Sequence, residues 1–169
     1  MTPHTLLLQM TKMLRQLDGW LTKATAHAEA KKYDTAVLAQ TRLTPDMFPL
    51  ARQIQSACDA AKFAASRTTG KDAPSFPDTE TTFAELSARI GKTVEYLGTI
   101  SEADFAGVEG RTVSLPRWEG KSLTAIDYLV EHAQPNFFFH LTTSYAILRQ
   151  VGVDIGKRDY LGTLSFRPA

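Results

Sequence analysis

Four segments of this sequence carry apolar residues at intervals of three and four, the spacing that builds one apolar face on an α-helix. The pattern is clearest at residues 6–21, recurs at 50–65 and 83–97, and returns at 126–148. Residues 33–44 show no such period and are predicted to form a loop. Because each helix must bury its apolar face against a neighbour, the chain is predicted to adopt an all-α fold.

The polar segments between these stripes predict where helices begin. In residues 44–49, Thr44 or Asp46 can act as the N-cap, and the prolines fit the first turn, where a backbone N–H is not needed. One glycine and two prolines interrupt residues 68–77, after which Asp78 or Thr79 can cap the third helix. We therefore expect the second and third helices to start at these caps.

The segment that precedes the fourth stripe changes its period to two. Residues 111–115 alternate polar and apolar side chains, so we expect a short hairpin or extended excursion within 105–122. Pro135 lies inside the fourth stripe and removes a backbone hydrogen bond, so this helix either kinks or consists of two helices that meet near residue 134. After Gly152, glycines and bulky apolar residues alternate, which predicts an ordered C-terminal strap over the bundle.

The composition of the chain restricts its expected cellular compartment and its expected binding partners. The 169 residues are 43% hydrophobic and 22% charged, which suits one domain covering residues 1–169. A formal charge of +1, with acids and bases interspersed, argues against nucleic acid and against a membrane surface as partners. The single cysteine, Cys58, lies on an apolar stripe and is expected to be a small buried residue. Without a signal-peptide pattern or a membrane-length apolar run, the chain is expected to be cytoplasmic.

The fourth helix carries the most informative polar residues, His132, Asn136 and His140. Their spacing of four places all three on one helix face, about one turn apart. The two histidines are separated by about 12 Å of helix axis, which is too far for both to bind one ion on an unbroken helix. Asn136 and His140 form the close pair. This pair predicts either part of a metal site or buried polar groups that are satisfied by hydrogen bonds to neighbouring helices.

A metal site would need at least one more donor from a neighbouring helix. Gln53 and Asp46 are seven residues apart and share a face of the predicted second helix. Asp59 lies on a different side and is a poorer candidate. If an ion binds, zinc or nickel is the expected divalent metal, although amide oxygens are weak ligands for either beside imidazole.

Several segments resemble the DinB/YfiT-like superfamily of helical bundles, in particular an uncharacterised bacterial branch defined as a domain of unknown function. The segment that resembles the superfamily's fourth helix is residues 140–152, in which a histidine is followed by Leu-Arg and then glycine. The marks of the branch are residues 43–50, 53–59, 135–140 and 156–162. The resemblance implies a four-helix bundle with a long crossover, a homodimer, and a site between the second and fourth helices.

The resemblance also assigns positions to the superfamily's metal triad, which is one histidine on the second helix and two histidines four apart on the fourth. His140 matches the last of these, Asn136 stands where the other fourth-helix histidine belongs, and Gln53 is nearest to the second-helix position. Amides therefore replace two of the three imidazoles, so the triad is degenerate. Superfamily members with an intact triad include metal-dependent thiol transferases and isomerases.

These observations lead to two hypotheses about function. The favoured one is a small-molecule pocket between the second and fourth helices that involves Gln53, Asn136 and His140, with His132 and Asp46 as further ligand-binding candidates and no tightly held ion. The alternative is a metal-dependent transferase, including a thiol-dependent one, or a hydrolase. In that case His140 and a nearby amide or carboxylate would bind a divalent ion, with water as the reactive group.

Overall fold

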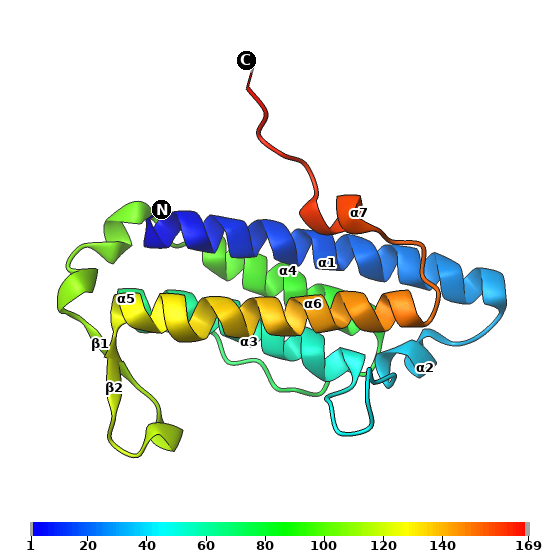
Figure 1. Cartoon of the computed structure of the whole chain (residues 1–169), viewed down its shortest axis with the longest axis horizontal. Helices are drawn as coiled ribbons and strands as arrows, with labels where there is room; N and C mark the ends of the chain where they lie inside the picture. Colours follow the sequence, from blue (N-terminus) through cyan, green and yellow to red (C-terminus); the bar gives the residue numbers. More distant parts are fainter. Residues whose placement is uncertain (1, 168–169) are drawn as a thin grey trace.

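The computed structural model describes residues 2–167. Within this part, long helices lie side by side and form a bundle (Figure 1): α1 (Pro3–Lys31), α3 (Leu50–Thr69), α4 (Phe83–Gly98) and α6 (Gln134–Gln150). The short helix α2 (Thr35–Ala39) lies at one end of the bundle, and α7 (Lys157–Leu161) lies over α1. The predicted helical bundle is confirmed.

The apolar stripes seen in the sequence form the core of the bundle. Leu17 and Trp20 of α1 and Leu86 and Ile90 of α4 are almost completely buried. The buried residues of α3 are largely alanines, including Ala57, Ala61 and Ala65, and α6 is the helix that α3 contacts most extensively. Small side chains let the two helix backbones approach closely, so α3 and α6 are the natural walls of any site between them.

The crossover between α3 and α4 runs back along the bundle (Figure 1), so these two helices point in the same direction. Ion pairs hold it in place. Arg89 of α4 lies 3.0 Å from Asp78 and 3.0 Å from Glu80 of the crossover, and 2.9 Å from Asp59 of α3. Its side chain is 1% exposed. The long crossover implied by the family resemblance is therefore present and is tied to both helices through one buried guanidinium.

The chain between α4 and α6 leaves the bundle in a small hairpin. Strand β1 (Thr112–Ser114) pairs antiparallel with β2 (Ser122–Thr124), with Val113 opposite Leu123. Short 3-10 turns lie before and within this hairpin, at Glu102–Phe105, Val108–Gly110 and Pro116–Trp118. The predicted excursion is confirmed.

The last long helix changes type close to its proline. The single turn α5 (Ala125–Asp127) leads into a π-helical segment, Tyr128–Ala133, and α6 begins at Gln134. Pro135 thus lies directly after the π-helical segment, and the change in hydrogen-bond pattern there accommodates its missing N–H. The helix therefore changes type near residue 134, where the proline was predicted to interrupt it, but its backbone stays helical through Ala133 and Gln134.

The C-terminal segment lies across α1, as predicted. The indole Nε1 of Trp20 donates a hydrogen bond of 3.2 Å to the carbonyl oxygen of Asp159, and its ring stacks on Tyr160 with centroids 5.5 Å apart. Lys23 pairs with the Asp159 carboxylate at 2.6 Å. An aromatic contact and an ion pair therefore hold α7 on the bundle.

Two predictions near the start of the second long helix were wrong. α3 begins at Leu50, with Pro49 as its N-cap residue, so Asp46 lies in the preceding loop. The hydroxyl of Thr44 donates a 2.7 Å hydrogen bond to the Asp46 carboxylate within this loop, and neither residue caps α3. Residues 33–44, predicted to be a loop, also contain α2. Its N-cap is Asp34, whose side chain accepts a hydrogen bond from the backbone N–H of Ala36.

The predicted cap of the third long helix was also wrong. Thr82 is the N-cap of α4, and it forms a reciprocal capping box with Glu85. Asp78 is instead an ion-pair partner of Arg52 and Arg89. Asp78 resembles a cap in the sequence because its ion-pair partners, Arg52 and Arg89, lie far from it along the chain.

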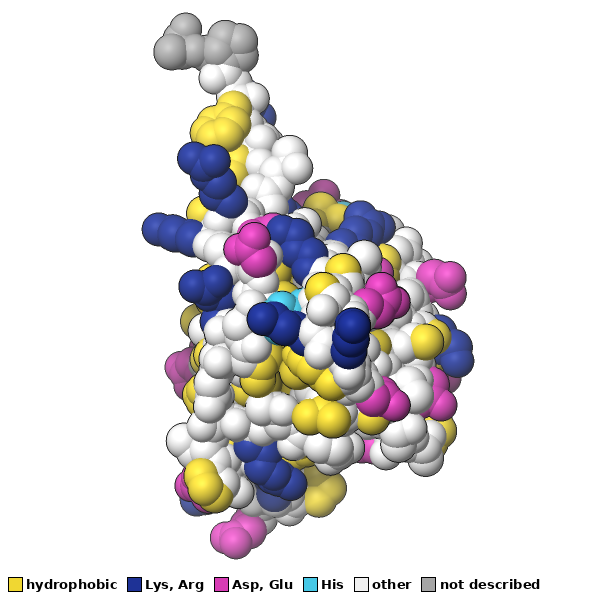
Figure 2. All heavy atoms as spheres, turned by 90° about the vertical axis from the view of Figure 1, so that its right-hand side faces the viewer, with side chains coloured by type: hydrophobic (Ala, Val, Ile, Leu, Met, Phe, Trp, Pro, Cys, Tyr) yellow, Lys and Arg dark blue, Asp and Glu magenta, His cyan; other side chains and the backbone are white. Residues whose placement is uncertain are grey.

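None of the helices in the described part of the chain is both long enough and apolar enough to cross a membrane. Figure 2 views one end of the bundle, where basic and acidic side chains are interspersed and the C-terminal segment projects from the surface. The absence of nucleic-acid partners stays a prediction.

Candidate functional site

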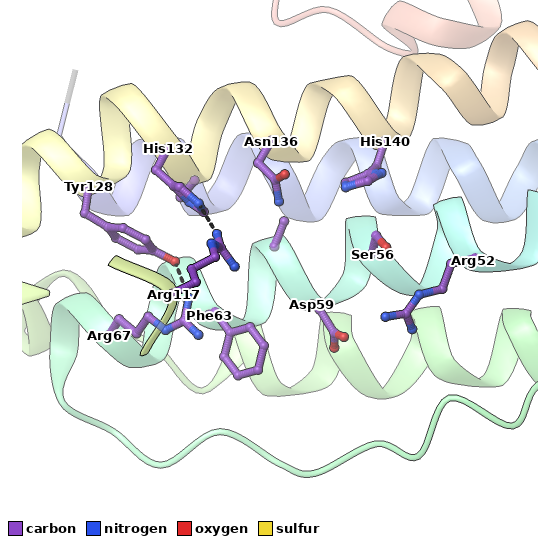
Figure 3. Close-up of a pocket in the computed structure, with 12 residues that line it drawn as sticks. Arg52, Ser56, Asp59, Phe63, Arg67, Arg117, Tyr128, His132, Asn136 and His140 are labelled. Carbon is purple, nitrogen blue, oxygen red and sulfur yellow. Dashed lines mark hydrogen bonds between the residues drawn. The ribbon is translucent and has the colours of Figure 1, made fainter. Parts of the chain in front are cut away.

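A cavity of about 250 Å³ lies between α3 and α6 (Figure 3). Its wall is rich in polar side chains from three parts of the chain. α3 contributes Arg52, Ser56, Asp59 and Arg67, the π-helical segment and α6 contribute Tyr128, His132, Asn136 and His140, and the hairpin contributes Arg117. The arrangement suits a ligand with several polar groups.

The three polar residues of the fourth stripe point from one helix face towards α3 (Figure 3). His132 and His140 lie near opposite ends of the cavity, and Asn136 lies between them. The side chain of Asn136 makes no hydrogen bond with another residue in the described range 2–167, so its amide is free to contact a ligand. His132 and Tyr128 belong to the π-helical segment, a rare geometry that is frequent at functional sites.

His140 has a fixed hydrogen-bond partner on α3. Its Nδ1 lies 2.7 Å from Oε1 of Gln53, and the Gln53 Nε2 donates a 3.2 Å hydrogen bond to the carbonyl oxygen of Phe48. A carbonyl can only accept, so the amide orientation of Gln53 is determined, and its Oε1 must accept from His140. Nδ1 therefore carries the proton, and Nε2 of the neutral ring keeps its lone pair.

In His132, at the other end of the cavity, the bonded ring nitrogen is Nε2 rather than Nδ1. A guanidinium has no acceptor, so Nη2 of Arg117, 2.5 Å away, donates to Nε2 of His132. Nδ1 of His132 carries the proton in the neutral ring and has no partner among the described residues. The ring stacks on Tyr128 with centroids 5.3 Å apart. His132 thus orients Arg117 rather than presenting a free nitrogen to the cavity.

The pKa of each histidine is lowered from its ordinary value of 6.5, which favours the neutral ring at pH 7. Burial is the largest cause that lowers the pKa of His140, followed by the charge of Arg52. Burial also lowers the pKa of His132, with contributions from Arg117 and Arg67. The cavity therefore holds imidazoles that accept or donate hydrogen bonds without adding positive charge.

This pKa depression predicts a specific pH dependence of stability. Unfolding returns each histidine to its ordinary pKa of 6.5, so below that pH the unfolded chain takes up protons more readily than the folded one. The free energy of unfolding should fall as the pH drops from 6.5 towards 5. Urea titrations of the wild type and of His140→Gln measure this, and the variant should show the smaller slope. An equal slope would contradict the depressed pKa of His140.

The structure brings together most, but not all, of the site residues predicted from sequence. The cavity is lined by His132, Asn136 and His140. Gln53 forms a hydrogen bond with His140 but is not itself part of the cavity wall. Asp46 does not share a helix face with Gln53, because it lies in an exposed loop before α3, and it is not part of the wall. Asp59, judged the poorer candidate, does line the cavity.

Sequence reasoning missed Arg67, Arg117 and Tyr128. The Nη1 of Arg67 donates a 2.9 Å hydrogen bond to the Tyr128 hydroxyl, from a helix 61 residues earlier in the chain. Tyr128 and His132 are four apart, so their shared face was readable from the sequence. Arg117 gave no usable signal, because only the fold of the hairpin brings it to His132.

The side chains present do not by themselves form a transition-metal site. The amide of Gln53 is bonded to His140 and Phe48, which leaves one imidazole nitrogen and the amide of Asn136 facing the cavity. Zinc in proteins takes three or four protein ligands. No group of three or more histidine, cysteine, aspartate or glutamate side chains in residues 2–167 has the arrangement of a metal site. The metal site stays a prediction.

The expected role of the lone cysteine agrees with the structure. Cys58 is fully buried on the face of α3 that packs into the core. Burial raises the pKa of its thiol to about 12, so the nucleophilic thiolate is absent at neutral pH. Cys58 contributes to packing and lies outside the cavity wall.

Comparisons with known proteins agree with the fold. A family described as "Domain of unknown function (DUF1993)" matches residues 4–161. The crystal structure of a DinB family member protein from Shewanella denitrificans is 47% identical in sequence, with a TM-score of 0.95. The match covers 98% of this chain and 95% of that chain. No curated protein matches the sequence.

Proposed function

Since the chain belongs to the DUF1993 family and has a DinB-type fold, we propose that it binds a small molecule in the cavity between α3 and α6. The observation that carries this proposal is the state of His140. Gln53 holds the ring with Nδ1 protonated, which leaves the lone pair of Nε2 available on a residue that lines the cavity. His140 then accepts a hydrogen bond from the ligand, and Asn136 provides both a donor and an acceptor beside it.

The size of the cavity supports a small ligand. Its volume of about 250 Å³ is below the roughly 300–1,000 Å³ of pockets that bind drug-sized molecules. The wall contains charged and polar side chains along its whole length, from Arg52 to Arg117. A small, polar metabolite fits this combination better than an apolar one.

The two histidines give a direct test of this proposal. We expect His140→Ala to weaken binding of cavity ligands more than His132→Ala, because the acceptor nitrogen Nε2 is unbonded in His140 and is already bonded to Arg117 in His132. Ligand-detected NMR with a library of polar fragments, followed by titration of each variant, measures the difference. Equal losses in the two variants would contradict the ranking. His140→Ala also leaves the Gln53 side chain without its hydrogen-bond partner. The free energy of unfolding of this variant should therefore fall by about 1–3 kcal/mol.

The second candidate is a metal-dependent transferase or hydrolase that uses His140. One observation favours it: metal-binding histidines usually donate their other ring N–H to an oxygen, as His140 does to Gln53. Asn136 and Gln53 do not complete a ligand set, so we rank this candidate second. Metal analysis of untagged protein after dialysis against a mild chelator separates the two. Stoichiometric zinc or nickel would move the metal-dependent enzyme to first place.

A further inference from the structure

We propose that the ligand of this cavity is an anion, whose carboxylate or phosphate group is bound between Arg67 and Arg117. This inference rests on the proposed small-molecule function and adds the chemical class of the ligand. It is based on two guanidinium groups that line the same cavity and meet one stacked pair of rings, Tyr128 and His132.

Neither arginine has a carboxylate partner. Arg67 is held by the hydroxyl of Tyr128 at 2.9 Å and lies over the ring of Phe63 at 4.3 Å. Arg117 is held by Nε2 of His132. Within residues 2–167, no aspartate or glutamate forms an ion pair with either guanidinium. The protein thus orients both cations with neutral groups and leaves their charges uncompensated.

The two charges act on the same place. Arg117 contacts His132 and Arg67 contacts Tyr128, whose ring stacks on His132, so both charges lie near this ring and lower the pKa of His132. Figure 3 shows both side chains at the same end of the cavity, with Arg67 reaching the Tyr128 hydroxyl from α3 and Arg117 reaching His132 from the hairpin. Like charges in a partly enclosed site repel each other, and an anion between them would relieve that repulsion.

The remaining charged groups of the wall do not offset this potential. Asp59 is the only acidic residue among those that line the cavity in the described chain, and its carboxylate is bonded to Arg89 at 2.9 Å and to Lys62 at 3.0 Å. Arg52, at the other end, pairs with Asp78. Unused N–H donors therefore concentrate at the end of the cavity where Arg67 and Arg117 lie, and a guanidinium binds carboxylates and phosphates through paired hydrogen bonds.

The position of His140 then fixes the shape of the ligand. His132 and His140 are separated by about 12 Å along the helix. A ligand that has its anionic group between the two arginines reaches His140 only if it is elongated, and it passes Asn136 on the way. The structure therefore favours an extended small molecule with an anionic group at one end and a hydrogen-bond donor at the other.

The test uses the full chain labelled with ¹⁵N in histidine and arginine, titrated with succinate, with inorganic phosphate, and with acetamide as a neutral probe. Succinate or phosphate should shift the Arg67, Arg117 and His132 signals saturably, and should raise the pKa of His132. Acetamide should do neither. The double variant Arg67→Gln with Arg117→Gln keeps donors for Tyr128 and His132, and it should weaken anion binding by about tenfold or more.

Lys121→Gln is the matched control, because it removes a positive charge from an exposed site on the same hairpin. It should leave anion binding within about twofold of the wild type. A response to succinate alone identifies a carboxylate, and a response to phosphate alone identifies a phosphate; either supports the inference. No saturable response to either anion, or equal losses in Lys121→Gln and the double variant, would overturn it.

If neutral fragments shift His140 while anions do not, only this inference fails. If no compound shifts His140, the proposed function fails as well.

Discussion

Arg89→Ala should lower the free energy of unfolding by about 3–5 kcal/mol, the loss that follows when one partner of a buried ion pair is removed. Arg89 is 1% exposed and binds carboxylates from two segments, Asp59 of α3 and Asp78 and Glu80 of the crossover. Without the guanidinium these three carboxylates face one another with much less compensation. Denaturant unfolding followed by circular dichroism measures the effect.

The matched control is Lys92→Ala, an exposed position on the same helix. It should change the free energy of unfolding by less than about 0.5 kcal/mol. A loss below about 1 kcal/mol for Arg89→Ala would show that the cluster is solvated and weak. Because Asp59 also forms part of the cavity wall, Arg89→Ala should disturb ligand binding as well as stability.

Trp20→Ala should also lower the free energy of unfolding by about 3–5 kcal/mol, the usual range for removal of a buried large aromatic side chain. Trp20 is almost fully buried, its ring packs against Tyr145 and Tyr160, and its Nε1 holds the backbone of Asp159. Its loss should free the α7 strap as well as open the core. Denaturant titration measures the first effect, and limited proteolysis near residues 157–161 measures the second.

Tyr160→Ala separates these two contributions. This variant removes the stacking partner from α7 and leaves the core side of Trp20 in place. It should make α7 accessible to protease with a much smaller loss of stability than Trp20→Ala. Equal losses in the two variants would show that the strap, and not the core, provides the stabilisation by Trp20.

The parts of the fold that follow from local periodicity could be predicted from the sequence. A helix that is half buried needs apolar residues every three or four positions, so the long helices were visible in the sequence. The hairpin was visible for the same reason, with a period of two. The helix starts were less predictable, because Asp46 and Asp78 both look like caps. Their actual hydrogen-bond and ion-pair partners depend on how the loops fold.

The candidate site, too, could be predicted from the sequence only in the part that depends on local spacing. His132, Asn136 and His140 share a helix face through their spacing, so the sequence predicted their common direction. Arg67 and Arg117 meet at the cavity only through tertiary structure: one lies on α3 and the other on the turn of the hairpin. The role of Gln53 as the residue that sets the tautomer of His140 also required coordinates, because it depends on the carbonyl of Phe48.

The most direct test of the binding proposal is the ¹⁵N NMR spectrum of the His140 ring at pH 7, recorded before and during titration with a compound from the fragment screen. The structure predicts a neutral ring with Nδ1 protonated, and a saturable shift of Nε2 when a ligand binds. Gln53→Ala should reduce the preference for this tautomer. A free protein with Nε2 protonated, or an Nε2 signal that no compound shifts, would contradict the proposal that His140 is the ligand-facing group of this cavity.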